Sequence, residues 1–214
     1  MPDERMTPLD TDAPLQYRDV HAGFWRRACA YMIDFFIVGI PGFIILSFCM
    51  LEWTTLIVTL APLTFVTHIY RIGFHTRKGA TPGKQLLGIR VIRADGEAIE
   101  LDEAFLRSAV DIAFAIILAV SLYVALLKIN AMEFNHLPFL KKNMLLNMNK
   151  PSWDWVLQTS NCLWFLASAI SVCVSAQRRA LHDFIAGTVV IKSRYANRAD
   201  LGKLLASESP NYAE

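Results

Sequence analysis

The stretch GFWRRACAYMIDFFIVGI, residues 23–40, decides the fold class, because it is apolar over most of its length and still holds basic and acidic side chains. Arg27 and Asp34 are seven residues apart. On an α-helix this spacing places them about 20° apart on one face and about 10.5 Å apart along the axis. A long arginine side chain also tends to reach toward the membrane surface. The spacing therefore disfavours a direct ion pair between the two.

The composition around this stretch is that of a membrane protein. Of the 214 residues, 54% are hydrophobic and 19% are charged, and the mean hydropathy is +0.35. These values are too apolar for an ordinary soluble domain of this size and favour a polytopic membrane protein. A net charge of +2 gives no basic excess that would indicate a nucleic-acid partner.

Hydrophobic length predicts an all-α membrane protein with four transmembrane helices. Crossing about 30 Å of hydrocarbon takes roughly 20 mostly apolar residues. Backbone groups in lipid are satisfied internally only when such a segment is helical. The predicted spans are residues 26–51, 53–71, 105–128 and 155–176.

The distribution of Lys and Arg predicts the orientation. Four lie in the N-terminal part, seven between spans two and three and six in the C-terminal part, against four on the other side of the membrane. The positive-inside rule then places both termini in the cytoplasm. The polar segment 1–22 has no apolar core, so we expect a cytoplasmic N-terminal segment rather than a cleaved signal peptide.

The connections carry further expectations. Residues 86–101 have β-branched runs around Asp95-Gly96 and predict a small cytoplasmic β-hairpin, with which the run 187–193 is a candidate to pair. The outer loop 129–152 is either an irregular loop or a helix on the outer leaflet. These segments complete a membrane domain over residues 23–193. Residues 194–214 are predicted to be a solvated cytoplasmic tail.

Embedded charge singles out a candidate site. An ionised Asp near the centre of a spanning helix costs about 2.5 to 3.5 kcal/mol, so Asp34 needs a partner, a water-filled cavity or a proton. Arg107 and Asp111 repeat the pattern one turn apart in the third span. The candidate ion, proton or structural charge cluster consists of Arg27, Asp34, Arg107, Asp111 and Asp183. Both an exchange site and a lock between helices fit these residues.

Three separated segments resemble the RDD family of integral membrane proteins, named for one arginine and two aspartates. They are GFWRRACAYMID (23–34), TPGKQLLGIRVIRADG (81–96) and RRALHDFIAGTVV (178–190). By motif position Arg27 is similar to the family arginine, Asp34 to the first aspartate and Asp183 to the second. The resemblance implies the fold and a bacterial inner membrane. On activity it implies little: transport has been suggested, and some members are associated with cation/proton antiport.

No catalytic or cofactor site is predicted. The segment GATPGKQ, residues 79–85, lacks the first glycine and the final Ser or Thr of a phosphate-binding loop. The histidines are scattered, and neither they nor the cysteines have metal-ligand spacing, so we expect no enzyme, no cofactor and no metal. Thr81-Pro82-Gly83 instead predicts a turn at the membrane surface, with Lys84 near lipid headgroups.

Two functions remain open. The first is transport of a small cation or a proton-coupled solute, favoured by Asp34 and Asp111 and by expected helix breaks at Pro41-Gly42 and Pro62. The second is a non-transporting scaffold or accessory subunit, in which the charges hold helices together. The lipid bilayer is the expected partner of either, and a homo-oligomer or another membrane protein is a candidate partner.

Overall fold

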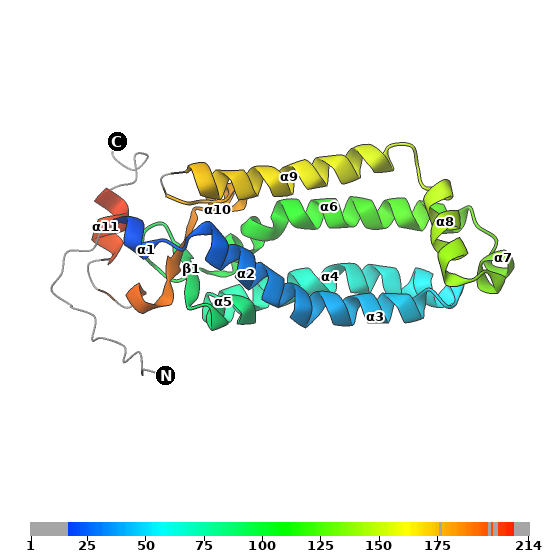
Figure 1. Cartoon of the computed structure of the whole chain (residues 1–214), viewed down its shortest axis with the longest axis horizontal. Helices are drawn as coiled ribbons and strands as arrows, with labels where there is room; N and C mark the ends of the chain where they lie inside the picture. The colour runs from blue at the N-terminus through cyan, green and yellow to red at the C-terminus, as the bar shows by residue number, and fades with distance from the viewer. Residues whose placement is uncertain (1–16, 176, 197, 199–200, 208–214) are drawn as a thin grey trace, which may run out of the picture.

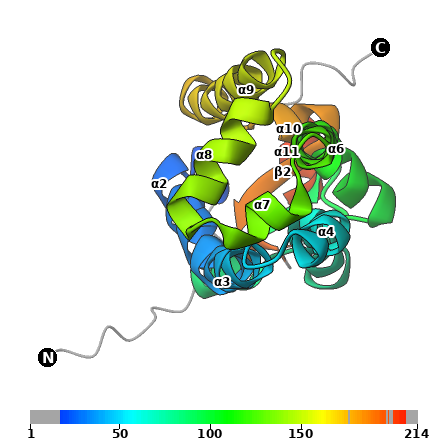
Figure 2. The same ribbon diagram turned by 90° about the vertical axis from the view of Figure 1, so that its right-hand side faces the viewer.

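Four long helical segments lie side by side along the molecule (Figures 1 and 2). Each is long and apolar enough to cross a membrane, and they confirm the four predicted spans. They cover Phe24–Cys49, Trp53–Lys78 (α4), Leu101–Leu127 (α6) and Asp154–Val174 (α9). The second span runs on to Lys78 and the third begins at Leu101, so both continue past the predicted bounds.

The computed structural model describes residues 17–175, 177–196, 198 and 201–207. Most of the predicted N-terminal segment and the last residues of the predicted tail lie outside this part of the chain. The remaining helices are short: α1 (Tyr17–Val20), α5 (Pro82–Leu86), α7 (Ala131–His136), α8 (Phe139–Asn149), α10 (Leu181–Ile185), η2 (Ser193–Tyr195) and α11 (Leu201–Ser207).

The first span is a continuous helix with a wider turn inside it. It consists of α2 (Phe24–Asp34), the π-helical turn η1 (Phe35–Gly39) and α3 (Ile40–Cys49). The π-helical turn shifts the carbonyls that the ring of Pro41 would otherwise strike, so the helix continues through the proline. Helix α4 likewise runs unbroken through Pro62. The predicted helix breaks at Pro41-Gly42 and Pro62 are therefore wrong.

A two-stranded antiparallel sheet closes one end of the molecule, which we call the sheet end. Strand β1 (Ile89–Arg93) pairs with β2 (Thr188–Lys192), with Val91 opposite Val190. The predicted small sheet is confirmed, and its second strand is the run that was a candidate to pair. Within the predicted hairpin 86–101, the two sides of the Asp95-Gly96 turn are joined by an isolated β-bridge between Ile92 and Ala98.

The sheet also fixes the start of the first span. The Ala22 amide donates to the Val190 carbonyl at 2.9 Å, and His21 forms a bridge with Ile191. Buried apolar side chains hold the strands beneath α2, α6 and the tail. The tail joins this core through Tyr195, Leu201 and Leu205, so the prediction of a solvated tail is wrong for these residues.

Helices α7 and α8 cover the opposite end of the bundle, which we call the α8 end (Figure 2). The helical alternative for the loop 129–152 is therefore the one that the structure forms. Phe134 and Leu146 face a core that includes Leu126 and Leu56. The buried Lys142 ammonium donates to the carbonyls of residues 50 and 51 at 3.1 and 2.7 Å, which satisfies acceptors at the end of α3.

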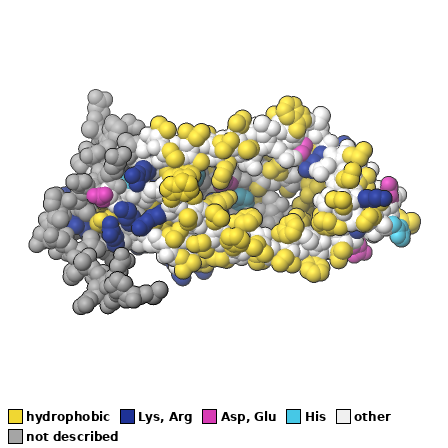
Figure 3. All heavy atoms as spheres, in the orientation of Figure 1, with side chains coloured by type: hydrophobic (Ala, Val, Ile, Leu, Met, Phe, Trp, Pro, Cys, Tyr) yellow, Lys and Arg dark blue, Asp and Glu magenta, His cyan; other side chains and the backbone are white. Residues whose placement is uncertain are grey.

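Hydrophobic side chains cover the outside of the bundle between its two ends (Figure 3). Phe43, Phe48 and Val58 are each about two-thirds exposed, at 65%, 67% and 67%. Apolar surface of this extent is covered by lipid or by another protein rather than by water. The chain is a multi-pass membrane protein.

Helix α5 packs directly on α2 because a glycine stands at the contact. A Cβ atom at Gly83 would lie 2.3 Å from the Ala30 carbonyl oxygen and 2.9 Å from the Asp34 carboxylate. Both neighbours belong to a membrane helix and have little room to move. The TPGK turn therefore reaches the level of Asp34 inside the bundle.

We predict that Gly83→Ala destabilises the protein by about 1 to 3 kcal/mol, because α5 must move off α2. Gly73→Ala is the matched control, since nothing lies within 4 Å of a Cβ there and alanine favours helix. Thermal unfolding in one detergent compares the two. Equal midpoints for both variants would contradict the close packing of α5 on α2.

Candidate functional site

Asp183 joins two arginines in the interior of the sheet end. Its side chain is completely buried. Arg27 Nη1 of α2 donates to Oδ2 at 2.7 Å, and Arg107 Nη2 of α6 forms an ion pair with Oδ1 at 2.7 Å. The Ala180 amide adds a bond to Oδ2 at 3.0 Å. This carboxylate therefore ties together two spans and the turn before α10.

The charges around Asp183 determine its ionisation. Burial opposes the charged form and by itself raises the pKa of Asp183, but Arg107 and the other positive neighbours outweigh burial and hold the pKa well below its usual value. Burial also lowers the pKa of His182 to about 3. His182 is therefore neutral, and its Nε2 accepts from Arg107 Nη2 at 3.2 Å.

Asp34 has a different set of partners, and Arg27 is not among them. Its Oδ1 accepts from the Tyr70 hydroxyl at 3.1 Å and from the Gly83 amide at 2.8 Å. Its Oδ2 accepts from the Thr81 hydroxyl at 2.5 Å. Three donors from α4 and from the start of α5 thus replace water around this carboxylate.

Asp111 of α6 connects the second, third and fourth spans. Arg71 Nη1 of α4 lies 3.1 Å from Asp111 Oδ2, and the Trp164 indole of α9 donates to Oδ1 at 3.1 Å. The Arg71 guanidinium also lies over the Tyr31 ring, 5.5 Å from its centroid. Both oxygens of Asp111 are therefore engaged, although this pair is less buried than that of Asp183.

Lys84 contacts a histidine, not a carboxylate. Its Nζ lies 2.8 Å from His75 Nε2, while His75 Nδ1 lies 2.6 Å from the Arg71 carbonyl oxygen. A carbonyl only accepts, so Nδ1 carries the proton and Nε2 accepts from Lys84. Burial, followed by the charges of Arg107 and Arg71, lowers the pKa of Lys84 well below its usual value.

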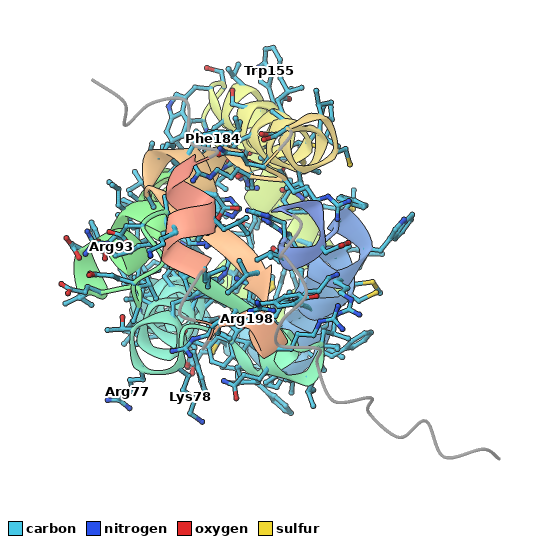
Figure 4. The ribbon with its side chains drawn as sticks, turned by 90° about the vertical axis from the view of Figure 1, so that its left-hand side faces the viewer. Arg77, Lys78, Arg93, Trp155, Phe184 and Arg198 are labelled. Carbon is cyan, nitrogen blue, oxygen red and sulfur yellow. The ribbon has the colours of Figure 1, made fainter. Side chains whose placement is uncertain are left out.

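These groups form one polar layer at the sheet end of the bundle. Its basic members outnumber its carboxylates by one. The polar layer comprises Arg27, Arg71, Lys84, Arg107, Asp34, Asp111 and Asp183, with His75 and His182 beside them. Arg77 and Lys78, at the end of α4, point away from the bundle instead (Figure 4). If Lys84 gives up its proton, the formal charges of the polar layer cancel.

The structure brings Arg27, Arg107 and Asp183 of the candidate cluster together and gives Asp34 and Asp111 separate partners. The expectation against a direct Arg27–Asp34 pair agrees with these contacts. The expectation for Lys84 is wrong: the TPGK turn enters the bundle, and the ammonium meets His75 rather than lipid headgroups.

The predicted cluster left out Arg71 and His75, and it left out Lys84 because that residue was assigned to the membrane surface. Arg71 and His75 are four residues apart in α4, which places both on one face. That spacing was a usable signal, although it does not reveal which loop supplies the partner.

The fold and the polar layer define a class of four-span membrane protein in which seven charged side chains and two histidines meet among the helices at the sheet end. Within that class, the chain belongs to the RDD family, whose sequence profile matches residues 21–187. The resemblance read from the three motifs is confirmed. No curated protein and no solved structure matches the chain.

We predict that Asp183→Asn lowers the free energy of unfolding by about 3 to 5 kcal/mol, because it leaves two buried arginines without their common counter-charge. Asp111→Asn is the matched control and costs less, since solvent partly screens that pair. Thermal unfolding and yield of folded protein in detergent measure both variants. A larger loss at Asp111 would refute the ranking.

A second prediction concerns the pH dependence of stability. Between the lowered pKa of Lys84 in the folded state and the ordinary value of 10.5, the unfolded chain holds a proton that the folded chain lacks. The contribution of Lys84 to the free energy of unfolding therefore rises with pH through this window. Lys84→Met lacks that contribution, so the stability difference between the parent and the variant grows in favour of the parent as pH rises. Unfolding midpoints in detergent from neutral to alkaline pH check this, and a constant difference would show that Lys84 does not titrate in this window.

Proposed function

We propose that the chain is a proton-coupled membrane transport protein in which the Lys84–His75 pair carries the proton. One observation supports this assignment above the others: a lysine with a lowered pKa sits among arginines, with a neutral imidazole as its hydrogen-bond partner. Proton transfer needs a group whose two protonation states are close in free energy. The lowered pKa of Lys84 brings its two protonation states closer in free energy than those of an exposed lysine at neutral pH.

The carboxylates of the polar layer fit it less well. Asp34 accepts three hydrogen bonds, and both oxygens of Asp111 and Asp183 are bonded to cationic or N–H donors. Binding a metal cation would require breaking these contacts. Among the described residues no three carboxylate, imidazole or thiol groups gather as a ligand set. These facts favour a proton over a metal cation.

A second histidine offers the next position for a proton. His68 lies seven residues before His75 in α4, which places it about 10.5 Å further into the bundle on nearly the same face. Its side chain is buried, and its Nδ1 has no hydrogen-bond partner within the part of the chain that the structure describes. His75 and His68 would form the inner part of the pathway, with Arg71 and Asp111 between them.

The setting of this function follows from the charge distribution. The sheet end, which holds the excess of Lys and Arg, would face the cytoplasm of a bacterial inner membrane, with both termini on that side. Four spans enclose little space, so the broad apolar surface of the bundle would be shared with a second copy of the chain or with another membrane protein.

The test is proton flux in proteoliposomes that contain a trapped pH-sensitive dye, with valinomycin and potassium holding the membrane potential fixed. We predict that the parent dissipates an imposed pH gradient and that Lys84→Met slows this by about a hundredfold. Lys84→Arg also fails, because a guanidinium keeps its proton at these pH values. Lys203→Met, an exposed lysine of α11, is the matched control and retains the parental rate.

The Asp34→Asn variant tests whether the proton is carried by Lys84 or by the Asp34 carboxylate. Flux lost in Asp34→Asn but retained in Lys84→Met would move the proton site to the Asp34 carboxylate and overturn the assignment to Lys84. Every sample is compared at equal incorporation of folded protein, judged by its elution as a single species in detergent.

A scaffold or accessory subunit is the second candidate function, and the bonded state of the three carboxylates favours it. Carboxylates whose oxygens are all bonded to protein donors can hold helices in place, and they offer no free oxygen to bind a proton or a cation. No proton flux from the parent, at an incorporation that the control variant also reaches, would select this function. The next measurement would then be copurification of a membrane partner in mild detergent.

A further inference from the structure

Four basic side chains from separate segments gather outside the polar layer at the sheet end. We call them the arginine–lysine patch: Arg26 in α2, Arg178 in the α9–α10 connection, Lys192 at the end of β2 and Arg194 in η2. Figure 3 shows Lys and Arg side chains gathered near the start of α2, where the hydrophobic surface of the spans ends. The patch is independent of the proposed proton pathway.

The sheet brings these segments together. The hydrogen bond from the Ala22 amide to Val190 places the start of α2 beside the end of β2. Arg178 lies against this junction, since its Nη1 is 3.2 Å from the position of a Cβ on Gly23. Burial lowers the pKa of Lys192, and the charges of Arg194, Arg26 and Arg178 lower it further. Three guanidinium groups therefore lie close enough to act on one ammonium.

The patch has little negative charge of its own. Asp19 is the acidic neighbour that acts on Lys192. Within the described part of the chain no carboxylate forms an ion pair with Arg26, Arg178 or Lys192. The first turn of α2 also has neither an acidic residue nor a side-chain cap. A concentration of like charge without internal partners is stabilised by an external anion.

The exposed face of α2 beside the patch indicates which kind of molecule the anion belongs to. Trp25 is 78% exposed, and Cys29 and Met32 follow it on the same face of α2, both exposed. Indole rings favour the level of lipid headgroups, and the apolar residues beyond it face acyl chains. A phospholipid meets both requirements with one molecule, because its phosphate and its chains are adjacent.

We propose that the arginine–lysine patch binds the phosphate of an anionic phospholipid whose acyl chains lie along Trp25, Cys29 and Met32. Guanidinium groups match phosphate oxygens in charge and geometry. The bound lipid would fix the start of α2, and with it the position of Arg27, at the membrane surface. The net negative headgroup distinguishes this lipid from zwitterionic neighbours.

The test is native mass spectrometry of the purified full chain, mixed with equal amounts of phosphatidylglycerol and phosphatidylcholine. We expect the parent to retain phosphatidylglycerol with a preference of about tenfold or more. The triple variant Arg26→Gln/Arg178→Gln/Lys192→Gln loses the preference. The matched control, Arg77→Gln/Lys78→Gln/Lys203→Gln, removes three exposed charges elsewhere and keeps it.

Three outcomes would overturn the proposal: no preference in the parent, a preference that survives the triple variant, or an equal loss in the control. Displacement of the lipid by excess inorganic phosphate at the patch would also overturn it, because the site would then recognise a soluble anion. If the triple variant does not fold, the double variant Arg26→Gln/Lys192→Gln decides the question. A preference reduced by the double variant supports the site, and an unchanged preference refutes it.

Discussion

The carboxylate of Asp183 is buried between two arginines, and the arrangement of the sheet end depends on that interaction. Removing a carboxylate from water costs several kcal/mol unless charges and hydrogen bonds replace the water. Arg27 and Arg107 provide this replacement from two different spans. Their side chains reach Asp183 only if both helices begin at the right height. The ion pairs therefore fix the relative positions of α2, α6 and α10.

The sheet makes this arrangement possible. Strand β2 begins five residues after Asp183 and pairs with β1, while the segment before α2 bonds to the other edge of β2. Apolar burial of Val91, Val190 and Ile191 stabilises these pairings without any charge. The strands bring the two arginines and the carboxylate within reach. In return, the ion pairs hold the strands against the spans.

The sequence was sufficient to predict the membrane helices and to single out five charged residues of the polar layer, but not the Lys84–His75 pair. Span length is set by bilayer thickness, so it can be counted directly. The hydrogen-bond and ion-pair partners of each charged side chain could not be deduced from residue spacing. Helical spacing disfavoured an Arg27–Asp34 pair, but the true partners of Asp34 come from Tyr70 and from the TPGK turn. Their approach depends on Gly83 fitting against α2, which is a property of the packed structure.

The two wrong predictions about backbone have related causes. Prolines were expected to interrupt helices, yet a π-helical turn before Pro41 relieves the steric conflict locally. The tail, residues 194–214, was expected to be solvated. Its apolar residues Tyr195, Leu201 and Leu205 instead pack against buried side chains of the sheet. In both cases an adjacent element changed the outcome: the π-helical turn accommodates Pro41, and the sheet gives the tail residues an apolar surface to pack on. Local sequence propensity does not contain this information.

The charge inventory of the polar layer links its structure to its chemistry. Its three arginines are matched by the carboxylates of Asp34, Asp111 and Asp183, whose oxygens all accept bonds. A proton on Lys84 adds a fourth positive charge without a carboxylate to balance it. The cost of holding that proton is therefore greater than in water, and its loss to a neighbour is correspondingly easier. The complete bonding of the carboxylates is thus the reason why the proposed proton pathway uses Lys84 and His75 instead.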